Sequence, residues 1–340
     1  MTLNSRSYHL TRSGDTNKLI RCDNAAPKPN HHQVLIRMGA ASLNYRDLLT
    51  RQDVTTNRTG LIPLSDGAGT IVAVGSEVSQ WKEGDRVSPN FFPDWHGGTF
   101  SPTYPAKALG GGQIDGVLSD YIVAEESSLV EVPSHLTLTE AACLPCAGLT
   151  AWRALFEGGE LKAGDTVLVQ GTGGVALFGL QLATAYGARV IVTSSSDAKL
   201  ERAHSLGAWQ TINYRTQSEW DKVALDLTDG KGVDHILELG GPDTYNRSIT
   251  AIAAGGRIAQ IGVLTGFVLQ PNILPLMFKN ASINGICVGS VAHFELLNRY
   301  ISDHQIHPVI DQVFGFNDVP EAYELLKSAS HFGKIVIDLT

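Results

Sequence analysis

The amino-acid sequence predicts an α/β protein in which a β-rich N-terminal domain precedes a doubly wound parallel sheet. A continuous β-branched and apolar run at 166–169, typical of a buried parallel strand, leads directly into a glycine turn and a helix start. From about residue 139 onward, helical and strand-like stretches alternate, as they do when helices join parallel strands. The chain has 340 residues, which is long for one core, so we expect two domains.

The glycine turn fits the dinucleotide-binding pattern G-x-G-x-x-G/A. Gly171 permits a tight turn, Gly173 lets a pyrophosphate approach the backbone, and Ala176 keeps the helix close to the strand. The helix expected at 175–186 would direct its first amides and its positive dipole end at the phosphates. A glycine-rich loop alone is weak evidence, but a second strand at 189–193 completes a βαβ unit and favours a bound dinucleotide.

The other elements follow from hydrophobic periodicity and turn residues. A long irregular segment at 90–116, rich in proline, glycine and aromatic residues, has the length of a functional or mobile loop. We expect strands at 32–38, 69–74, 85–88, 166–170, 189–193, 210–213, 233–238, 256–261, 282–288, 311–316 and 334–338, and helices at 45–51, 175–186, 197–206, 217–228, 243–253, 293–303 and 318–327.

Composition excludes some functions and compartments. The formal net charge is −8, from 26 basic and 34 acidic residues, which disfavours nucleic-acid binding. The polar start of the chain lacks the apolar core of a signal peptide, and no apolar run reaches membrane-spanning length, so we expect a cytoplasmic protein without a membrane partner. Four cysteines are too few for a disulfide scaffold.

Several short motifs, spread over residues 35 to 337, together resemble the medium-chain dehydrogenase/reductase superfamily. The resemblance implies a GroES-like β-rich catalytic domain at 1–127, a Rossmann NAD(P)-binding domain at 128–288, and a tail, 289–340, that returns to the first domain. It is closest to the zinc-independent branch that includes quinone and enoyl reductases, although such chains are often labelled zinc-type alcohol dehydrogenases. The similar segments are 44–47, 63–69, 74–78, 84–87, 144–150, 171–179 and 333–334.

The resemblance also bears on metal binding. Zinc-dependent members carry their catalytic ligands where this chain has Asn44, Ser65–Asp66 and Cys146. A catalytic zinc needs three ligands from Cys, His, Asp and Glu, and this set does not supply them. The region that binds structural zinc in some relatives, 89–116 here, contains no cysteine. We therefore expect no zinc, with a zinc-type alcohol dehydrogenase as the alternative.

Cys143 and Cys146 form a C-x-x-C motif. It could be a redox pair or half of a zinc site, but no second C-x-x-C completes a tetrahedral set. We favour two small, half-buried residues at a helix start, since free cysteines are commonly buried.

The end of the second strand of the nucleotide-binding domain indicates the cofactor. NAD-selective enzymes place an acid there for the ribose 2′-hydroxyl, and alignment to the family puts Ser194 at that position. Hydroxyls at Ser194 and Ser195, with Lys199 nearby, would accept a 2′-phosphate. Asp197 is better interpreted as a helix N-cap. NADP(H) is thus favoured over NAD(H), with Tyr214 and Arg215 either contacting the nucleotide or forming a surface turn.

By resemblance, the nicotinamide is expected between the domains, near Thr150 and the ends of the later strands. Lys334 could approach the cofactor from the returning tail or be a surface lysine. The full set of predicted cofactor residues is Thr150, Gly171, Thr172, Gly173, Gly174, Val175, Ser194, Ser195, Lys199, Tyr214, Gly240, Gly262, Val263, Cys287, Val288 and Lys334.

Without zinc, hydrogen-bond donors must stabilise the charge that hydride transfer creates on an oxygen. We predict Asn44 as a partner of the carbonyl or the cofactor ribose, Tyr45 as a donor or proton source, and Arg46 with Asp47 as supporting charges. The alternative is that Asp47 only caps the helix at 45–51 and Tyr45 only packs. An aromatic wall over the cleft, with His96 and Tyr104 as further donors, is predicted from Phe92, Trp95, His96 and Tyr104.

The sequence thus predicts a zinc-independent, NADPH-dependent oxidoreductase that reduces a carbonyl, a quinone or an activated C=C bond. The alternatives are a zinc-type alcohol dehydrogenase and a weakly catalytic NADPH-binding protein. By resemblance we also expect a homodimer, with the edge strand at 281–288 available to pair with its mate.

Overall fold

The computed structural model describes residues 3–268 and 270–340, and they form two compact units. The first unit comprises Met1–Leu149 with Val288–Thr340, and the second comprises Thr150–Cys287. The boundary predicted from the sequence between the first two domains, 127/128, lies before the end of the first segment of the first unit at Leu149. Residues after 128 pack with the first unit because strand β7 (Leu129–Glu131) pairs with β5 (Arg86–Pro89). Within the described ranges, no helix is both long and apolar enough to cross a membrane.

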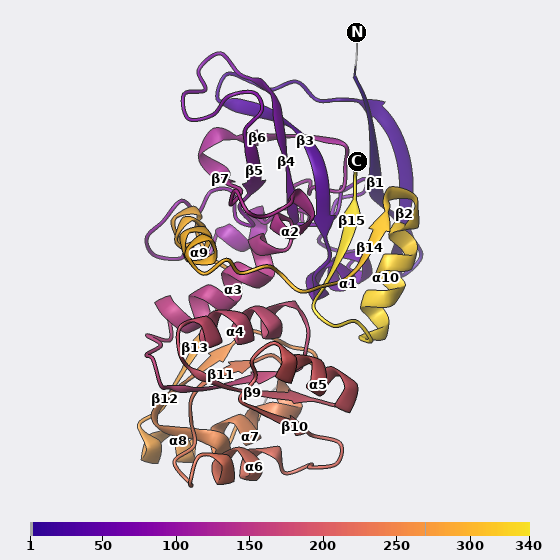
Figure 1. Ribbon diagram of the computed structural model, residues 1–340. Helices are drawn as coiled ribbons and strands as arrows, with labels where there is room; N and C mark the ends of the chain where they lie inside the picture. Colours follow the sequence, from indigo (N-terminus) through magenta and orange to yellow (C-terminus); the bar gives the residue numbers. More distant parts are fainter. Residues whose placement is uncertain (1–2, 269) are drawn as a thin grey trace. The chain divides into compact units, whose positions relative to one another are not determined.

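The second unit contains a six-stranded sheet in the order β10-β9-β8-β11-β12-β13, in which every neighbouring pair is parallel. Helices α4 and α5 cover one face, and α6, α7 and α8 cover the other (Figure 1). This arrangement confirms the predicted doubly wound sheet. The strands are β8 (Thr166–Gln170), β9 (Arg189–Ser194), β10 (Gln210–Asn213), β11 (Val233–Glu238), β12 (Ile252–Gln260) and β13 (Ser282–Gly285). The helices are α4 (Gly174–Ala185), α5 (Asp197–Ser205), α6 (Trp220–Leu227), α7 (Pro242–Ala251) and α8 (Leu274–Lys279). The unit begins with part of α3 (Leu149–Trp152) and the π-helical turn Arg153–Glu157.

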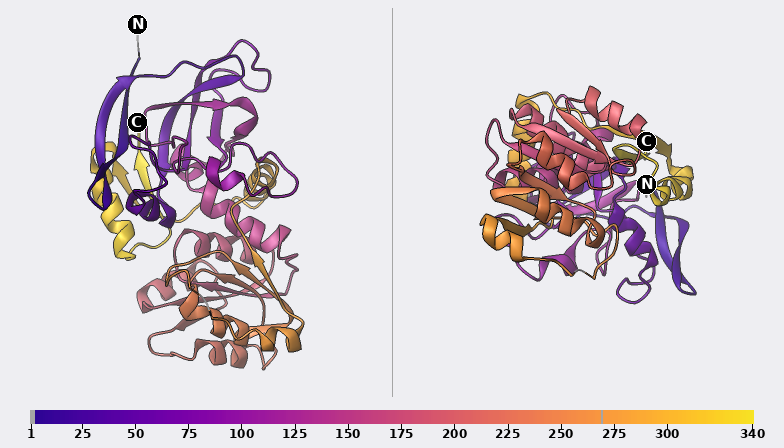
Figure 2. Two further views of the ribbon diagram at one scale, coloured as in Figure 1. Left: turned by 180° about the vertical axis from the view of Figure 1, so that it is seen from behind. Right: turned by 90° about the horizontal axis from the view of Figure 1, so that it is seen from below.

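The first unit contains a sheet in the order β14-β15-β3-β4-β5-β7, with β6 paired to β3. The last strand, β15, pairs antiparallel with β3, so residues 288–340 belong to the first unit. Figure 2 shows these C-terminal elements beside the strands from the start of the chain. Besides β5 and β7, the strands are β3 (Gln33–Ser42), β4 (Asp66–Val74), β6 (Tyr121–Glu125), β14 (Ile310–Gly315) and β15 (Lys334–Asp338). The helices are α1 (Tyr45–Gln52), α2 (Leu138–Ala141), α9 (Val291–Asp303) and α10 (Val319–Ser328), with the π-helical turn Leu144–Gly148.

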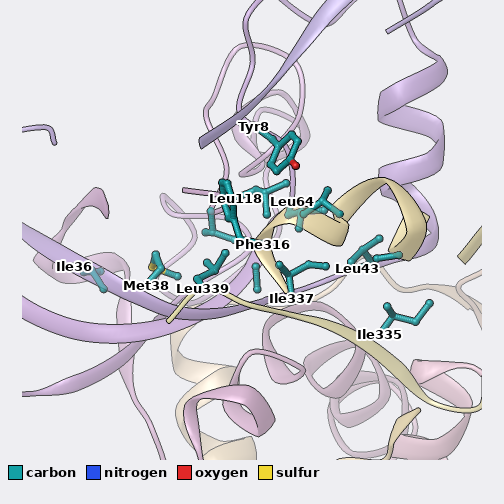
Figure 3. Packing of buried hydrophobic residues seen from close by; sticks show 14 of the residues in the cluster. Tyr8, Ile36, Met38, Leu43, Leu64, Leu118, Phe316, Ile335, Ile337 and Leu339 are labelled. Atoms are coloured by element: carbon teal, nitrogen blue, oxygen red, sulfur yellow. The ribbon is translucent and has the colours of Figure 1, made fainter. Parts of the chain in front are cut away.

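A two-stranded antiparallel hairpin, β1 (Asn4–Ser13) and β2 (Thr16–Ala25), opens the chain. This hairpin was not predicted, because the residues of β1 are mostly polar and its alternation of buried and exposed side chains gives no hydrophobic pattern. Tyr8 from β1 lies in the core against Phe316, with ring centroids 5.0 Å apart. Figure 3 shows this core, in which Ile337 and Leu339 from the tail pack with residues of the first hundred positions. The first unit therefore needs both ends of the chain to form its core.

Candidate active site

The glycine turn of the second unit has the geometry that a pyrophosphate requires. Gly171 has a φ of +79°, which a side chain would strain, and no atom lies within 4 Å of a Cβ added at Gly173. Helix α4 begins directly afterwards, at Gly174, and contributes the unpaired amides of its first turn. The turn thus leaves an open backbone surface at a helix N-terminus, which fits the phosphates of a dinucleotide.

Helix α4 approaches the sheet most closely at Gly179, a residue to which no role was assigned from the sequence. A Cβ at Gly179 would lie 2.6 Å from Cδ2 of Leu237 and 3.2 Å from Cγ1 of Val169. Ala176, to which we assigned this role, is buried and already carries a Cβ. The tight contact therefore falls one turn further along α4.

Most of the predicted cofactor residues lie at one edge of the sheet. Because all six strands run parallel, their carboxyl ends share that edge, where ligands bind in folds of this type. Thr150, Cys287 and Val288 lie where the chain passes between the units, and Lys334 lies in the first unit. The residues that follow the strands are Gly171, Thr172, Gly173, Gly174 and Val175 after β8, Ser194 and Ser195 at the end of β9, Tyr214 after β10, Gly240 after β11, and Gly262 and Val263 after β12.

A buried carboxylate, which the sequence analysis missed, holds the turn after β11. Oε1 of Glu238 accepts hydrogen bonds from the amides of Gly240 and Gly241, both at 3.0 Å, and Oε2 accepts one from Nε2 of Gln170 at 2.7 Å. Oε1 of Gln170 in turn accepts from the amide of Gly240 at 2.9 Å. The side chains of Thr244 and Ser248 complete the set around Glu238. A glutamate at a strand end carries no sequence signal for this role.

At the end of β9, Ser194 is buried and its Oγ accepts from the amide of Ser196 at 3.3 Å. Ser196 is the N-cap of α5, since its Oγ accepts from the amide of Lys199. The assignment of Asp197 as the cap is therefore wrong by one residue. Asp197 instead accepts from Nδ2 of Asn213 at 2.6 Å. Strand β9 thus ends in a serine, Ser194, and a second serine, Ser195, follows it.

In the first unit, three polar residues come together at the start of β15: Lys334, Asn44 and Asp66. Nζ of Lys334 donates to Oδ1 of Asn44 at 2.6 Å and lies 4.0 Å from Oδ2 of Asp66. Lys334 is only 3% exposed, so the interpretation as a surface lysine is wrong. Asp66 is fully buried, and its oxygens accept from Oγ of Ser65 at 2.6 Å and from the amide of Cys146 at 2.9 Å.

Helix α1 carries the other catalytic candidates. Oδ2 of Asp47 accepts from the amide of Asn44 at 2.7 Å, so Asp47 caps the helix. That capping is its only role stays a prediction. Burial raises the pKa of Asp47 to about 6, opposed by the nearby charge of Arg46. Tyr45 is 39% exposed at the helix start, apart from the buried cluster.

The donor set does not fit a catalytic zinc. Asn44 and Ser65 are not zinc ligands, and both oxygens of Asp66 already accept hydrogen bonds. The ammonium of Lys334 lies beside the carboxylate, where it would repel a dication. Across residues 3–268 and 270–340, no group of three or more His, Cys, Asp or Glu side chains is placed to hold a metal ion.

The C-x-x-C motif has the structural character that we favoured. Both thiols are free, Cys143 is buried and Cys146 is half-buried. Burial raises the pKa of both thiols, which opposes formation of the reactive thiolates.

The predicted aromatic residues form a cluster of their own in the first unit. Trp95 stacks on Tyr104 with centroids 5.6 Å apart, and Phe92 lies 6.2 Å from Trp95. Phe92 and Trp95 are each 1% exposed, so they form a core for the long irregular segment. His96 is exposed and its Nδ1 lies 3.1 Å from the carbonyl of Ser127. That these residues line a substrate pocket stays a prediction.

An open glycine turn at the binding edge of a doubly wound sheet, in a chain that also forms a β-rich unit, defines a nucleotide-dependent two-domain dehydrogenase. Comparisons with known proteins place the chain more narrowly. An "Alcohol dehydrogenase GroES-like domain" family model matches residues 30–134, and a "Zinc-binding dehydrogenase" model matches residues 174–303.

Whole-length relatives agree. The chain is 43% identical to a zinc-type alcohol dehydrogenase-like protein of Schizosaccharomyces pombe, over 92% of each chain, and 28% identical to the quinone oxidoreductase of Mus musculus, over 94% of this chain and 92% of that one. The crystal structure of an alcohol dehydrogenase-type protein from Sinorhizobium meliloti 1021 has a TM-score of 0.93 and 42% identity, with 99% of each chain covered. The protein therefore belongs to the medium-chain dehydrogenase/reductase superfamily and is an NAD(P)-dependent oxidoreductase.

Proposed function

We propose that this protein is a zinc-independent reductase that transfers hydride from NADPH to a carbonyl, a quinone or a C=C bond beside a carbonyl. The observation that carries the proposal is the polar cluster of the first unit. At the positions where, by resemblance, zinc-dependent members hold metal ligands, this chain has Asn44, Ser65 with Asp66, and Cys146. Only the cysteine is retained, and the Asp66 carboxylate lies 4.0 Å from Nζ of Lys334. The similarity to quinone oxidoreductases supports the substrate class.

The chain's own groups supply what the chemistry needs. The bound nicotinamide supplies the hydride. Negative charge then develops on the substrate oxygen, and the amide of Asn44 is the donor that we assign to it. The exposed hydroxyl of Tyr45 is the proposed proton source, and Arg46 and Asp47 support the charge balance.

Metal analysis and a substrate screen on the purified protein test this function. We expect substoichiometric zinc, activity that is insensitive to chelators, and oxidation of NADPH with quinones, enones or aldehydes. Stoichiometric zinc whose removal abolishes activity would favour the alcohol dehydrogenase alternative. Tight NADPH binding without turnover of any of the three substrate classes would favour the weakly catalytic binding protein. Either result overturns the proposal.

The preference for NADP(H) rests on the end of β9. Ser194 is neutral where an acid would repel the 2′-phosphate, Ser195 follows it, and Lys199 lies in the first turn of α5. Ser194→Asp should lower the ratio of kcat/KM for NADPH to that for NADH by about tenfold or more, because the new carboxylate repels the phosphate. Ser205→Asp is the matched control, since it adds the same charge at the exposed far end of α5. A wild-type preference for NADH would contradict the proposal.

The proposed homodimer rests on the edge of the second unit's sheet. Strand β13 is an edge strand, and α8, which precedes it in the chain and packs on the neighbouring β12, exposes Met277 and Phe278 by 66% and 78%. Phe267 is exposed by 73% in the preceding loop. An apolar surface next to an unpaired strand is typical of a contact between subunits.

A further inference from the structure

The buried lysine of the first unit has contacts that a structural salt bridge alone does not require. Nζ of Lys334 donates to Oδ1 of Asn44 at 2.6 Å and to the carbonyl of Leu43 at 2.7 Å, and it lies 4.0 Å from Oδ2 of Asp66. Its side chain is 2% exposed and that of Asp66 is fully buried. A buried charge is costly unless it is paired and hydrogen-bonded, and here both charges are.

The contact with Lys334 fixes the orientation of the Asn44 amide. An ammonium group can only donate, so the oxygen of the amide must face it and the NH₂ group must point away. Nδ2 of Asn44 is buried and has no hydrogen-bond partner among the residues that the structure describes. A buried donor without an acceptor costs free energy, which an oxygen atom of a bound ligand would recover.

Two of these residues, Asn44 and Asp66, lie at positions that by resemblance bear on metal binding in the superfamily. Asn44 and Asp66 stand where zinc-dependent members have ligands, and Asp66 also receives the amide hydrogen of Cys146, a third such position. Lys334 thus brings a positive charge to a cluster that does not fit zinc. The charge is single and covalently attached, and it reaches the site because β15 pairs with β3.

We propose that Lys334 is a built-in cation that takes the place of the metal, and that it acts as a positioning residue for Asn44. The ammonium balances the charge of Asp66 and polarises the amide of Asn44, so that Nδ2 donates to the substrate oxygen on which negative charge develops. This inference rests on the proposed zinc-independent function. It differs from the prediction that Lys334 contacts the cofactor.

A substitution at Lys334 separates these roles. Lys334→Met keeps an unbranched side chain one atom shorter than lysine and removes the charge. We expect kcat with a 1,4-benzoquinone substrate to fall about a hundredfold, the loss typical of an oxyanion donor, while the Kd for NADPH measured by fluorescence changes less than about twofold. An unchanged kcat, or a loss confined to NADPH affinity, overturns the inference.

Lys334→Met leaves the Asp66 carboxylate unpaired and could prevent folding. The double variant Lys334→Met/Asp66→Asn removes both charges and keeps an acceptor for the amide of Cys146, and it should fold and show the same loss of kcat. Recovery of wild-type kcat in this double variant would contradict the inference.

A double-mutant cycle with Asn44→Ala tests the positioning role. If Lys334 acts through Asn44, then Lys334→Met should lower kcat less than about twofold further in the Asn44→Ala background. Multiplication of the two separate losses would show a general structural effect and overturn the inference. The zinc content of the wild-type protein distinguishes the two failures. Stoichiometric zinc defeats the proposed function itself, whereas zinc-free protein with full activity of Lys334→Met defeats only the role of the lysine.

Discussion

Two buried carboxylates, one in each unit, are treated in opposite ways by the fold. Glu238 in the second unit accepts hydrogen bonds on both oxygens, from backbone amides and from three side chains. Asp47 in the first unit accepts from the amide of Asn44 on one oxygen, while its Oδ1 is buried without a partner among the described residues. Burial is complete in both cases.

The number of hydrogen bonds that a buried carboxylate accepts separates a structural group from one that is available for chemistry. A fully satisfied network rigidifies the turn that it holds, here the turn of Gly240 and Gly241 at the edge where the cofactor is expected. A partly satisfied group keeps hydrogen-bonding capacity in reserve, and a catalytic role is one explanation for a buried polar atom without a partner. Asp47 and Asn44 both belong to this second kind: Asn44 is the N-cap of α1, and Asp47 lies in the first turn of that helix.

The largest expected effect comes from removing the satisfied carboxylate. Glu238→Leu should lower the free energy of unfolding by about 3 kcal/mol or more, because it leaves several buried donors unpaired. Chemical denaturation measures this loss. Glu238→Gln is the control, since it keeps one acceptor oxygen for the amides of Gly240 and Gly241 and should cost clearly less. Equal stability of Glu238→Leu and wild type would show that the network contributes nothing.

Asp47→Asn should act in the opposite direction and stabilise the protein at neutral pH. The folded-state pKa of Asp47, about 6, lies above its usual value of 3.8 because burial disfavours the charged form. Between these values the folded state binds a proton that the unfolded state has released, so stability falls as pH rises from about 4 to about 6 and stays low above. A shift of about two pH units corresponds to about 3 kcal/mol.

The measurement is the difference in unfolding free energy between Asp47→Asn and wild type at several pH values. The difference should be small near pH 4 and should grow to as much as about 3 kcal/mol in favour of the variant above pH 6. Asp53→Asn is a useful contrast at the opposite end of the same helix, where Asp53 is the C-cap. Its hydrogen bonds to Thr55 and Thr56 lower the pKa of Asp53, so that variant should lose stability at neutral pH. A pH-independent difference for Asp47→Asn would refute the assignment.

Two glycines of the second unit differ in the room that their surroundings leave for a side chain: Gly179 in α4 and Gly173 in the nucleotide-binding turn. Gly179→Val should cost about 1–3 kcal/mol, because the added atoms overlap Leu237 and Val169. Gly173→Val meets open space at its Cβ and has an extended backbone, so it should change stability by less than about 1 kcal/mol. The expected damage there is to the Kd for NADPH, which should rise at least about tenfold as the side chain fills the phosphate surface. Tight NADPH binding by Gly173→Val would remove the turn from the site.

The sequence predicts the second unit far better than the polar cluster of the first. Strand β8 has the bounds that we expected, because a continuous β-branched and apolar run that ends at a glycine turn specifies a buried parallel strand locally. The position of Lys334 is not specified locally. Its contact with Asn44 joins residues 290 positions apart and exists only because β15 pairs with β3.

The hairpin of β1 and β2 shows a second limit. Its strands are stabilised by cross-strand pairing over ten residues each, and by a few buried side chains such as Tyr8 and Leu10, rather than by apolar composition. Hydrophobic periodicity therefore gives little signal there. The burial of Glu238 is hidden for a similar reason, since its partners come from β8, α7 and the turn after β11.

The smallest effect on the fold is expected at the exposed apolar side chains beside β13. Met277→Ser/Phe278→Ser should leave the free energy of unfolding of the isolated subunit nearly unchanged, because both side chains are mostly exposed. Since they would lie in the proposed contact between subunits, the variant should elute as a monomer where wild type elutes as a dimer in light-scattering chromatography. Val313→Ser, which removes an apolar side chain that is 47% exposed on β14 of the first unit, should remain a dimer. A dimeric Met277→Ser/Phe278→Ser variant would move the subunit contact away from α8.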